Sequence, residues 1–211
     1  MQQVTALLGI GAAIALGAAS PGPSFVMVAR TAIASSRPDG IYAALGMGIG
    51  GLVFAVAALL GLHGLLLAVP SLYWALKVIG GLYLAYLGLR IWVGAKKSLS
   101  SSPTESTPST SNALQSFALG LTTQISNPKT AVVYASVFAA FLPAESSLLF
   151  SFSVAGLVFM IETVWYTLVA LILSSNVPRQ LYLHYKAWID RVAGGMMMAL
   201  GFKLATSARQ S

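Results

Sequence analysis

The stretch SPGP at residues 20–23 interrupts the first apolar segment of this chain, and SNPK at residues 126–129 interrupts the fourth at the corresponding place. Proline removes a backbone donor and clashes with the preceding helical turn, so lipid-embedded helices tolerate it only where protein or a wet cavity satisfies the freed groups. Matched interruptions in two halves are the best sequence-level indication of a binding site at a repeat interface. The pair therefore predicts a transporter.

The composition is that of an integral membrane protein. Of 211 residues, 57% are hydrophobic and 8% are charged, and the mean hydropathy is +0.81. An average soluble protein has roughly 25% charged residues. The absence of cysteine excludes disulfides and thiolate metal sites. The net charge of +7 does not indicate a nucleic-acid partner, because the Lys and Arg residues form no basic stripe with stacking aromatics.

Six segments are apolar enough to cross a bilayer, whose core takes about 20 residues of helix. They are residues 4–29, 40–66, 70–94, 113–141, 146–173 and 187–206. A signal peptide is the alternative for the first segment, but no basic region precedes it and its apolar run resumes after the interruption. Residues 95–112 are rich in Ser, Thr and Pro and predict a cytoplasmic linker between a first repeat, 1–94, and a second, 113–211.

The positions of Lys and Arg predict that both termini lie on the outer face. These residues gather around the first, third and fifth connections between segments, and cytoplasmic loops carry such an excess. Three segments per half is an odd number, so homologous halves must be inverted relative to each other. Homology is indicated because Pro23 and Pro128 lie 105 residues apart (128 − 23), and GLVF at 51–54 recurs at 156–159 with the same offset. We expect an all-α fold of six transmembrane helices, arranged as a 3+3 inverted repeat with helices 1 and 4 broken at the proline motifs.

The residues around the two interruptions are candidates for substrate binding. Gly22 or Ser20 can cap a half-helix that begins at Pro23, and Asn127 can cap one that begins at Pro128. Free N–H groups and the positive ends of the helix dipoles would then attract a carboxylate. The alternative is a pair of proline kinks whose freed carbonyls are met by neighbouring hydroxyls. The predicted substrate-binding set is Pro21, Gly22, Pro23, Ser24, Ser126, Asn127, Pro128, Lys129 and Glu162.

Two charged residues of this set lie deep in predicted spans. Lys129 and Glu162 are each about sixteen residues into their segments, where a charge is costly and functional by default. Lys129 is a candidate ligand for a substrate carboxylate. Glu162 is a candidate for binding a substrate ammonium or for carrying a coupling proton. A buried ion pair between the two is the alternative.

Two further acids stand at predicted helix starts. Asp39 follows Pro38 at the start of the second span, and Asp190 precedes Arg191 at the start of the sixth. Helix capping is the simplest account of both, because a negative charge is favourable in the first turn. Asp39 also lies at the predicted inner mouth, which makes it a second candidate for proton coupling.

The chain lacks the motifs of several other classes. It has no G-x-x-x-x-G-K-[ST] phosphate loop and no H-E-x-x-H, and its two histidines have no metal-ligand partner at helical spacing. We therefore expect no metal, no cofactor and no enzymatic activity, although Ser126, three residues before Lys129, keeps an intramembrane enzyme open as an alternative. Gly46 and Gly50 are small residues four apart, which predict close helix packing within the bundle or across a homodimer.

Taken together, the motifs resemble the LysE/RhtB superfamily of amino-acid exporters. The resemblance lies in PGP at 21–23, in Lys77 with GGLYL at 80–84 and Gly88, and in NPK at 127–129. It implies a bacterial inner-membrane exporter of amino acids, driven by the proton gradient. The stretches 60–63, 137–138, 162–163 and 188–190 resemble the threonine and homoserine efflux branch, which implies a neutral amino acid as substrate.

The expected partners are the amino acid, protons and the lipid bilayer. In the expected mechanism, the half-helix starts and Lys129 meet the substrate carboxylate, while Glu162 takes the ammonium or exchanges the proton. Inverted halves would then rock to expose the site to each side in turn. A channel or scaffold subunit whose prolines merely shape helices is a further alternative.

Overall fold

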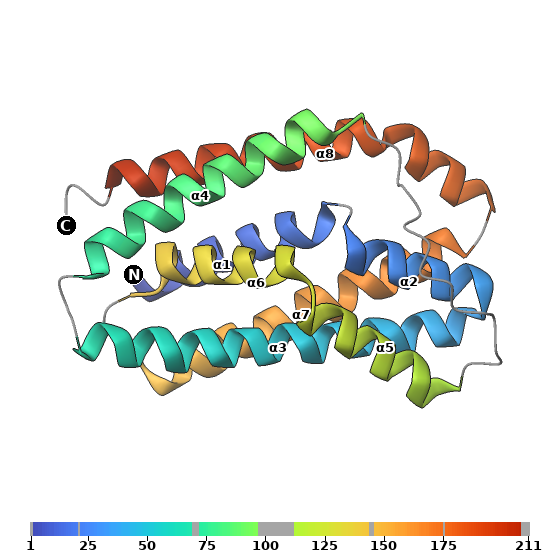
Figure 1. Ribbon diagram of the computed structural model, residues 1–211, viewed down its shortest axis with the longest axis horizontal. Helices are drawn as coiled ribbons and strands as arrows, with labels where there is room; N and C mark the ends of the chain where they lie inside the picture. The colour runs from blue at the N-terminus through green and yellow to red at the C-terminus, as the bar shows by residue number, and fades with distance from the viewer. Residues whose placement is uncertain are drawn as a thin grey trace.

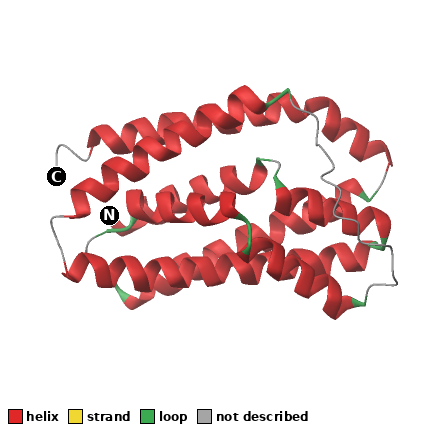
Figure 2. Ribbon diagram, viewed as in Figure 1, coloured by secondary structure: helices red, strands yellow, loops and turns green. Residues whose placement is uncertain are grey.

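The computed structural model describes residues 2–207 apart from 21, 69–71, 97–111, 144–145 and 175. This part of the chain is all helix and contains no strand (Figure 2), as the sequence predicts. Its helices are α1 (Gln2–Ala19), α2 (Pro23–Ala34), α3 (Arg37–Ala68), α4 (Leu72–Gly94), α5 (Ala113–Ile125), α6 (Pro128–Phe141), α7 (Leu148–Leu173) and α8 (Asn176–Ser207). Most of the predicted linker lies outside the described residues.

The helices form an elongated bundle in which α4 and α8 run side by side along one edge (Figure 1). On the opposite edge, α3 packs against both α5 and α7. Helices α1 and α6 lie between the two edges, since α1 contacts α7 and α8 while α6 contacts α3 and α4. Two clusters of buried side chains occupy the interior, one containing Ile14 and Phe138 and the other containing Phe25 and Met47.

The exterior of the bundle suits a lipid environment. Among the described residues, three helical segments are long and apolar enough to cross a membrane, namely Gln2–Ala19, Arg37–Gly61 and Leu148–Leu173. Shorter apolar segments are Pro23–Ile33, Val78–Gly94 and Pro128–Phe141. Large apolar side chains such as Leu148, Leu60 and Val93 are more than 70% exposed. Apolar surface on this scale needs a lipid or protein partner.

Helix α8 begins earlier than the sequence predicts. The sixth span is expected at 187–206, whereas α8 starts at Asn176. The polar residues before 187 lower the hydropathy of this region, but they do not stop the helix. Pro178 falls in the first turn, where a missing N–H has no cost, and Lys186 pairs with Asp190 one turn later. The capping interpretation of Asp190 is therefore wrong, because this residue lies well inside α8.

Glycines bring two pairs of helices into backbone contact. A methyl group added at Gly120 of α5 would collide with the carbonyl oxygen of Ala43 on α3, and one at Gly46 would collide with the backbone of α5. Gly88 of α4 and Gly194 of α8 face each other in the same way. Gly46 therefore packs within the chain, which was one of the two predicted alternatives.

Replacing Gly120 by Val is expected to lower the thermal unfolding temperature of the detergent-solubilised protein. The added side chain meets backbone rather than a movable side chain, and overpacking of this kind costs about 1–3 kcal/mol. Gly156→Val is the matched control, because a methyl group at Gly156 on α7 meets no atom within 4 Å. Equal melting of the two variants would contradict the proposed role of Gly120.

Candidate functional site

Two helices, α2 and α6, begin at proline partway along the bundle. Gly22 is the N-cap of α2 and has extended backbone (φ −157°, ψ −169°), and Pro23 follows it. Asn127 is the N-cap of α6, and its Oδ1 accepts a hydrogen bond of 3.0 Å from the backbone N–H of Lys129. Proline suits the first helical position because its nitrogen would have no intrahelical partner there. The positive end of each helix dipole favours an anion at these two starts, although the N–H of Lys129 is already bonded to its cap.

A buried hydrogen-bond chain joins the two junctions. The Ser24 hydroxyl, in the first turn of α2, donates to Oε1 of Gln124 at 2.7 Å. The same hydroxyl oxygen accepts from Nδ2 of Asn127 at 2.8 Å. All three side chains are at most 4% exposed. The start of α2 is thereby tied to the last turn of α5 and to the start of α6, although these residues are about one hundred positions apart in sequence.

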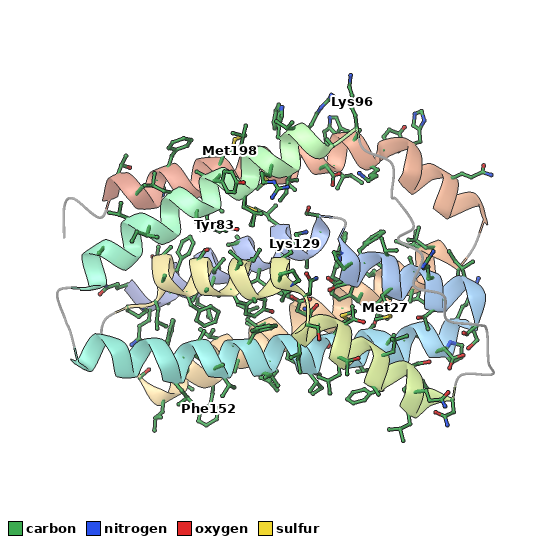
Figure 3. The ribbon with its side chains drawn as sticks, viewed as in Figure 1. Met27, Tyr83, Lys96, Lys129, Phe152 and Met198 are labelled. Carbon is green, nitrogen blue, oxygen red and sulfur yellow. The ribbon has the colours of Figure 1, made fainter. Side chains whose placement is uncertain are left out.

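Lys129 reaches from α6 to the end of α1. Its Nζ donates to the backbone carbonyl oxygens of Ser20 at 2.7 Å and of Gly17 at 3.3 Å. The C-terminus of a helix carries the negative end of its dipole, so an ammonium group is stabilised there. Figure 3 shows Lys129 inside the bundle, whereas Lys96 points away from it. Lys129 is thus held by uncharged oxygens rather than by a carboxylate.

Glu162 projects from α7 into the same region and is 3% exposed. Its Oε1 accepts a hydrogen bond of 2.9 Å from the Tyr134 hydroxyl. Its Oε2 and Nε2 of Gln124 each lack a hydrogen bond of good geometry among the described residues, although the two groups are close enough to interact. The ion pair between Glu162 and Lys129, one of the alternatives from the sequence, is not formed in this structure, because the ammonium contacts the α1 carbonyls. Glu162 therefore has unused capacity to accept a hydrogen bond.

These residues enclose a small cavity. Its lining includes Gly22, Ser24, Asn127, Lys129 and Glu162, together with Ile14 and Phe25 from the two core clusters. The cavity volume is about 20 Å³. A single water needs at least roughly 10–15 Å³ by this kind of measure, so an amino acid would fit only after the helices move apart. The polar centre is thus too narrow for the substrate in this structure.

The structure brings five of the nine predicted substrate-binding residues to this cavity, namely those just named around the two junctions and on α7. Pro23 and Pro128 are exposed and occupy the first positions of α2 and α6. Ser126 is exposed and ends α5, where its N–H donates to the carbonyl of Thr122. Pro21 lies outside the described residues.

Gln124 and Tyr134 were not assigned a role from the sequence. Gln124 could have been noticed as an amide in an otherwise apolar segment, three residues before Asn127. Tyr134 lies one helical turn beyond Thr130 on the face that lines the cavity. Tyrosines are frequent in membrane helices for other reasons, so the sequence alone did not distinguish this one.

Asp39 lies away from this cavity, at the start of α3. Its Oδ2 accepts from the Ser36 hydroxyl at 2.6 Å, and its backbone N–H donates to Ser36 Oγ at 3.2 Å. Its Oδ1 accepts from the buried Ser116 hydroxyl of α5 at 3.3 Å. Asp39 lies in the first turn of α3, where a negative charge is favourable, but Ser36 is the residue that caps the helix, and the Asp39 carboxylate holds the Ser36 hydroxyl in place. Asp39 is not among the residues that line the cavity, and its role in proton coupling stays a prediction.

Comparison with known proteins gives a family for this arrangement. Residues 15–208 match the family described as LysE type translocator. The threonine efflux proteins of Salmonella typhi and of Escherichia coli strain K12 are each 32% identical over 188 residues, covering 89% of this chain and 91% of theirs. The leucine efflux protein of Enterobacter sp. strain 638 is 30% identical over 128 residues, or 60% of this chain and 59% of that protein. No solved structure matches the chain.

The family match covers both helix junctions, Lys129 and Glu162, and it confirms the resemblance seen in the sequence motifs. The apolar helices agree with it, because a translocator has to cross the bilayer. This chain therefore belongs to the family of LysE type translocators, as a multi-pass membrane protein.

Proposed function

We propose that this protein is a secondary active exporter of amino acids across the bacterial inner membrane, driven by the proton motive force. The observation that carries the proposal is the convergence of an ammonium, a buried carboxylate and two helix starts at one cavity inside the bundle. An amino acid is a zwitterion, so its two charged groups are complementary to these features. The family match and the relatives named threonine and leucine efflux proteins support the same class of substrate.

The substrate carboxylate would bind at the starts of α2 and α6. Lys129 supplies a positive charge, and the starts of the two helices supply the positive ends of their dipoles. In the present structure the Lys129 ammonium is held by two carbonyl oxygens of α1. A carboxylate would compete well with them, because it adds a full negative charge to the partial charge that a carbonyl oxygen offers the ammonium.

The substrate ammonium or the coupling proton would be held by Glu162. Its Oε2 is buried and lacks a hydrogen bond of good geometry among the described residues, and the Tyr134 hydroxyl fixes the other oxygen at 2.9 Å. A neutral, hydroxyl-bearing amino acid fits the proposal best. Its side chain would lie near the amides and hydroxyl of the buried Ser24, Gln124 and Asn127 chain, where unpaired polar groups would otherwise be costly.

Transport would proceed by alternating access between two inverted repeats of three membrane spans. In this arrangement α1 with α2, and α5 with α6, are the two interrupted spans. The packing of the described helices is unequal around the cavity. This inequality supports rocking of one repeat against the other. Helix α6 packs against α4, and α1 packs against α8. By contrast, neither α2 nor α5 packs extensively against α4 or α8.

With both termini on the outer face, α2 and α5 form the cytoplasmic half of the interrupted spans. The looser packing would then lie on the side from which an exporter loads its substrate. Alkaline phosphatase fused to either terminus checks this orientation, and we expect an active enzyme at both ends. A homodimer remains a prediction from the small residues, to be tested by the mass of the purified protein in detergent.

Uptake of radiolabelled amino acids into inverted membrane vesicles tests the proposal. We expect saturable uptake of threonine or a related neutral amino acid that depends on an imposed pH gradient. The variant Ser126→Ala tests the alternative that the protein is an intramembrane enzyme. We expect this variant to transport like the wild type, because Ser126 is exposed and follows the last residue of α5. Non-saturable flux, or no gradient-dependent uptake of any amino acid, would contradict the exporter.

A further inference from the structure

A second buried acid lies on α8, away from the cavity lining. Asp190 is 4% exposed, and its Oδ2 accepts from the Lys186 ammonium at 2.8 Å. Lys186 also donates to the carbonyl oxygen of Ala95, just beyond the end of α4, at 3.4 Å. A buried ion pair is weak evidence for stability, because removing both charges from water offsets most of their attraction. The pair therefore calls for a role besides holding α8 to α4.

The other oxygen of this carboxylate is unused. Oδ1 of Asp190 is buried and has no hydrogen-bond partner among the described residues. An ionised carboxylate can accept about four hydrogen bonds, so pairing with Lys186 leaves room for a second donor. A buried acceptor without a donor is unfavourable, which indicates that a donor reaches Oδ1 in another state of the protein.

The direction in which Asp190 faces can be read from the packing around Gly17. A methyl group at Gly17 of α1 would lie 3.2 Å from Val133 of α6 and 3.9 Å from Met197 of α8. Met197 lies seven residues after Asp190, on the same face of α8. Figure 1 shows α6 and α8 running in the same direction along the bundle. The face of α8 that carries Asp190 is therefore turned toward Gly17 of α1, on which Val133 of α6 also packs.

Lys129 stands at the matching place on α6. It precedes Val133 by four residues, or about one helical turn, and so lies on the same face of α6. Its ammonium interacts electrostatically with the carboxylates of Asp190 and Glu162. Neither carboxylate contacts it directly, because the ammonium is bound to the α1 carbonyls. Lys129 thus lies between two acids and is attached to neither.

We propose that Asp190 is a second docking point for Lys129, and that the Lys129 ammonium moves from the α1 carbonyls to Oδ1 of Asp190 during transport. This inference rests on the proposed export function. Lys186, Asp190 and Lys129 would then form a triad that draws α6 and α8 together. The same movement would release the end of α1 from α6. The position of the Lys129 ammonium would therefore determine whether α6 is bound to α1 or to α8.

The decisive comparison is between Asp190→Asn and the double variant Asp190→Asn with Lys186→Gln. If Asp190 serves only to neutralise Lys186, the single variant leaves an unpaired buried charge, and removing both charges restores transport. If Asp190 receives Lys129, the double variant also fails. We expect both variants to show uptake of the proposed substrate, threonine, lowered by about tenfold or more, with binding of labelled threonine in detergent retained.

The possible outcomes separate the two proposals. A wild-type protein without gradient-dependent uptake would overturn the export function itself. A transporting wild type with a restored double variant would overturn the role of Asp190 and leave the export function standing. Loss of threonine binding in the double variant would also overturn it, because the proposed binding residues are unchanged there.

Cross-linking gives a measurement that does not depend on transport or on stable single variants. The chain contains no cysteine, so a pair introduced at Lys129 and Asp190 reports on that pair alone. A Lys–Asp contact spans a wider Cα separation than a disulfide, which needs Cα atoms within roughly 7 Å, so the cysteine pair is bridged with a bifunctional maleimide whose spacer matches the reach of the lysine side chain. We expect it to be cross-linked in membranes, as should the control pair at Gly17 and Val133, because a methyl group at Gly17 would lie 3.2 Å from Val133. Cross-linking of the control pair alone would overturn the proposal.

Discussion

Replacing Glu162 by Gln is expected to abolish gradient-driven uptake while the protein stays inserted and folded. Gln has nearly the same shape, and its amide oxygen can still accept the Tyr134 hydrogen bond, which is 2.9 Å long in the structure. The variant loses the charge that would bind an ammonium or exchange a proton. A hydrogen bond to a charged group contributes about 1.5–3 kcal/mol, so we expect the initial uptake rate to fall by roughly 10- to 100-fold or more.

Tyr134→Phe is the matched control for Glu162→Gln. It removes the hydrogen bond that Glu162→Gln keeps and leaves the carboxylate, so we expect a smaller loss of uptake than in Glu162→Gln. Wild-type flux in Glu162→Gln, measured per inserted protein, would remove Glu162 from the mechanism. A loss in Tyr134→Phe as large as that in Glu162→Gln would show that uptake depends on the Tyr134 hydrogen bond as strongly as on the charge.

Exchange experiments separate the two roles open to Glu162. Vesicles loaded with unlabelled threonine and placed in labelled threonine report exchange without any net proton movement. If Glu162 only carries the proton, Glu162→Gln is expected to exchange substrate while failing to accumulate it. If Glu162 binds the ammonium, both exchange and accumulation are lost.

The helix starts at the site could be predicted from the sequence because local chemistry decides them. Pro23 and Pro128 cannot continue a preceding helix, and Gly22 and Asn127 suit the capping position before them. Lys129 could also be singled out, because an ammonium deep in an apolar segment is rare enough to notice without a structure. These features depend on no residue far away in sequence.

The remaining features depend on contacts between distant segments. Gln124 gains its role from Ser24, one hundred residues earlier, and no local pattern indicates that pairing. The start of α8 was placed too late because a hydropathy window counts Lys186 against the helix. Its charge is offset by Asp190, so a polar turn can remain helical. Because the span was placed too late, Asp190 lay near its predicted start and was interpreted as a helix cap.

Replacing Lys129 by Ala is expected to abolish uptake with little change in thermal stability. The ammonium is the one charged side chain at the junction of α1 and α6 in the described structure, and it contacts only carbonyl oxygens there. The carbonyls at the end of α1 can turn to water when the ammonium is gone. Burying an ammonium is itself unfavourable, so its removal offsets the lost hydrogen bonds. Lys96→Ala is the matched control, because Lys96 is exposed and points away from the bundle.

A pair of ligands isolates the role of the ammonium. Threonine and threoninamide differ in that only threonine carries the carboxylate, so the difference in their affinities reports the carboxylate site. We expect the wild type and Lys96→Ala to bind threonine more tightly by roughly 10-fold or more, in line with a charge-assisted hydrogen bond. In Lys129→Ala this preference should become several-fold smaller, because only the helix dipoles at Pro23 and Pro128 then favour the carboxylate, while the amide loses nothing when the ammonium is removed. If the preference for threonine persists undiminished, the helix starts at Pro23 and Pro128 bind the carboxylate without Lys129, and the ammonium serves the movement between α1 and α8 alone.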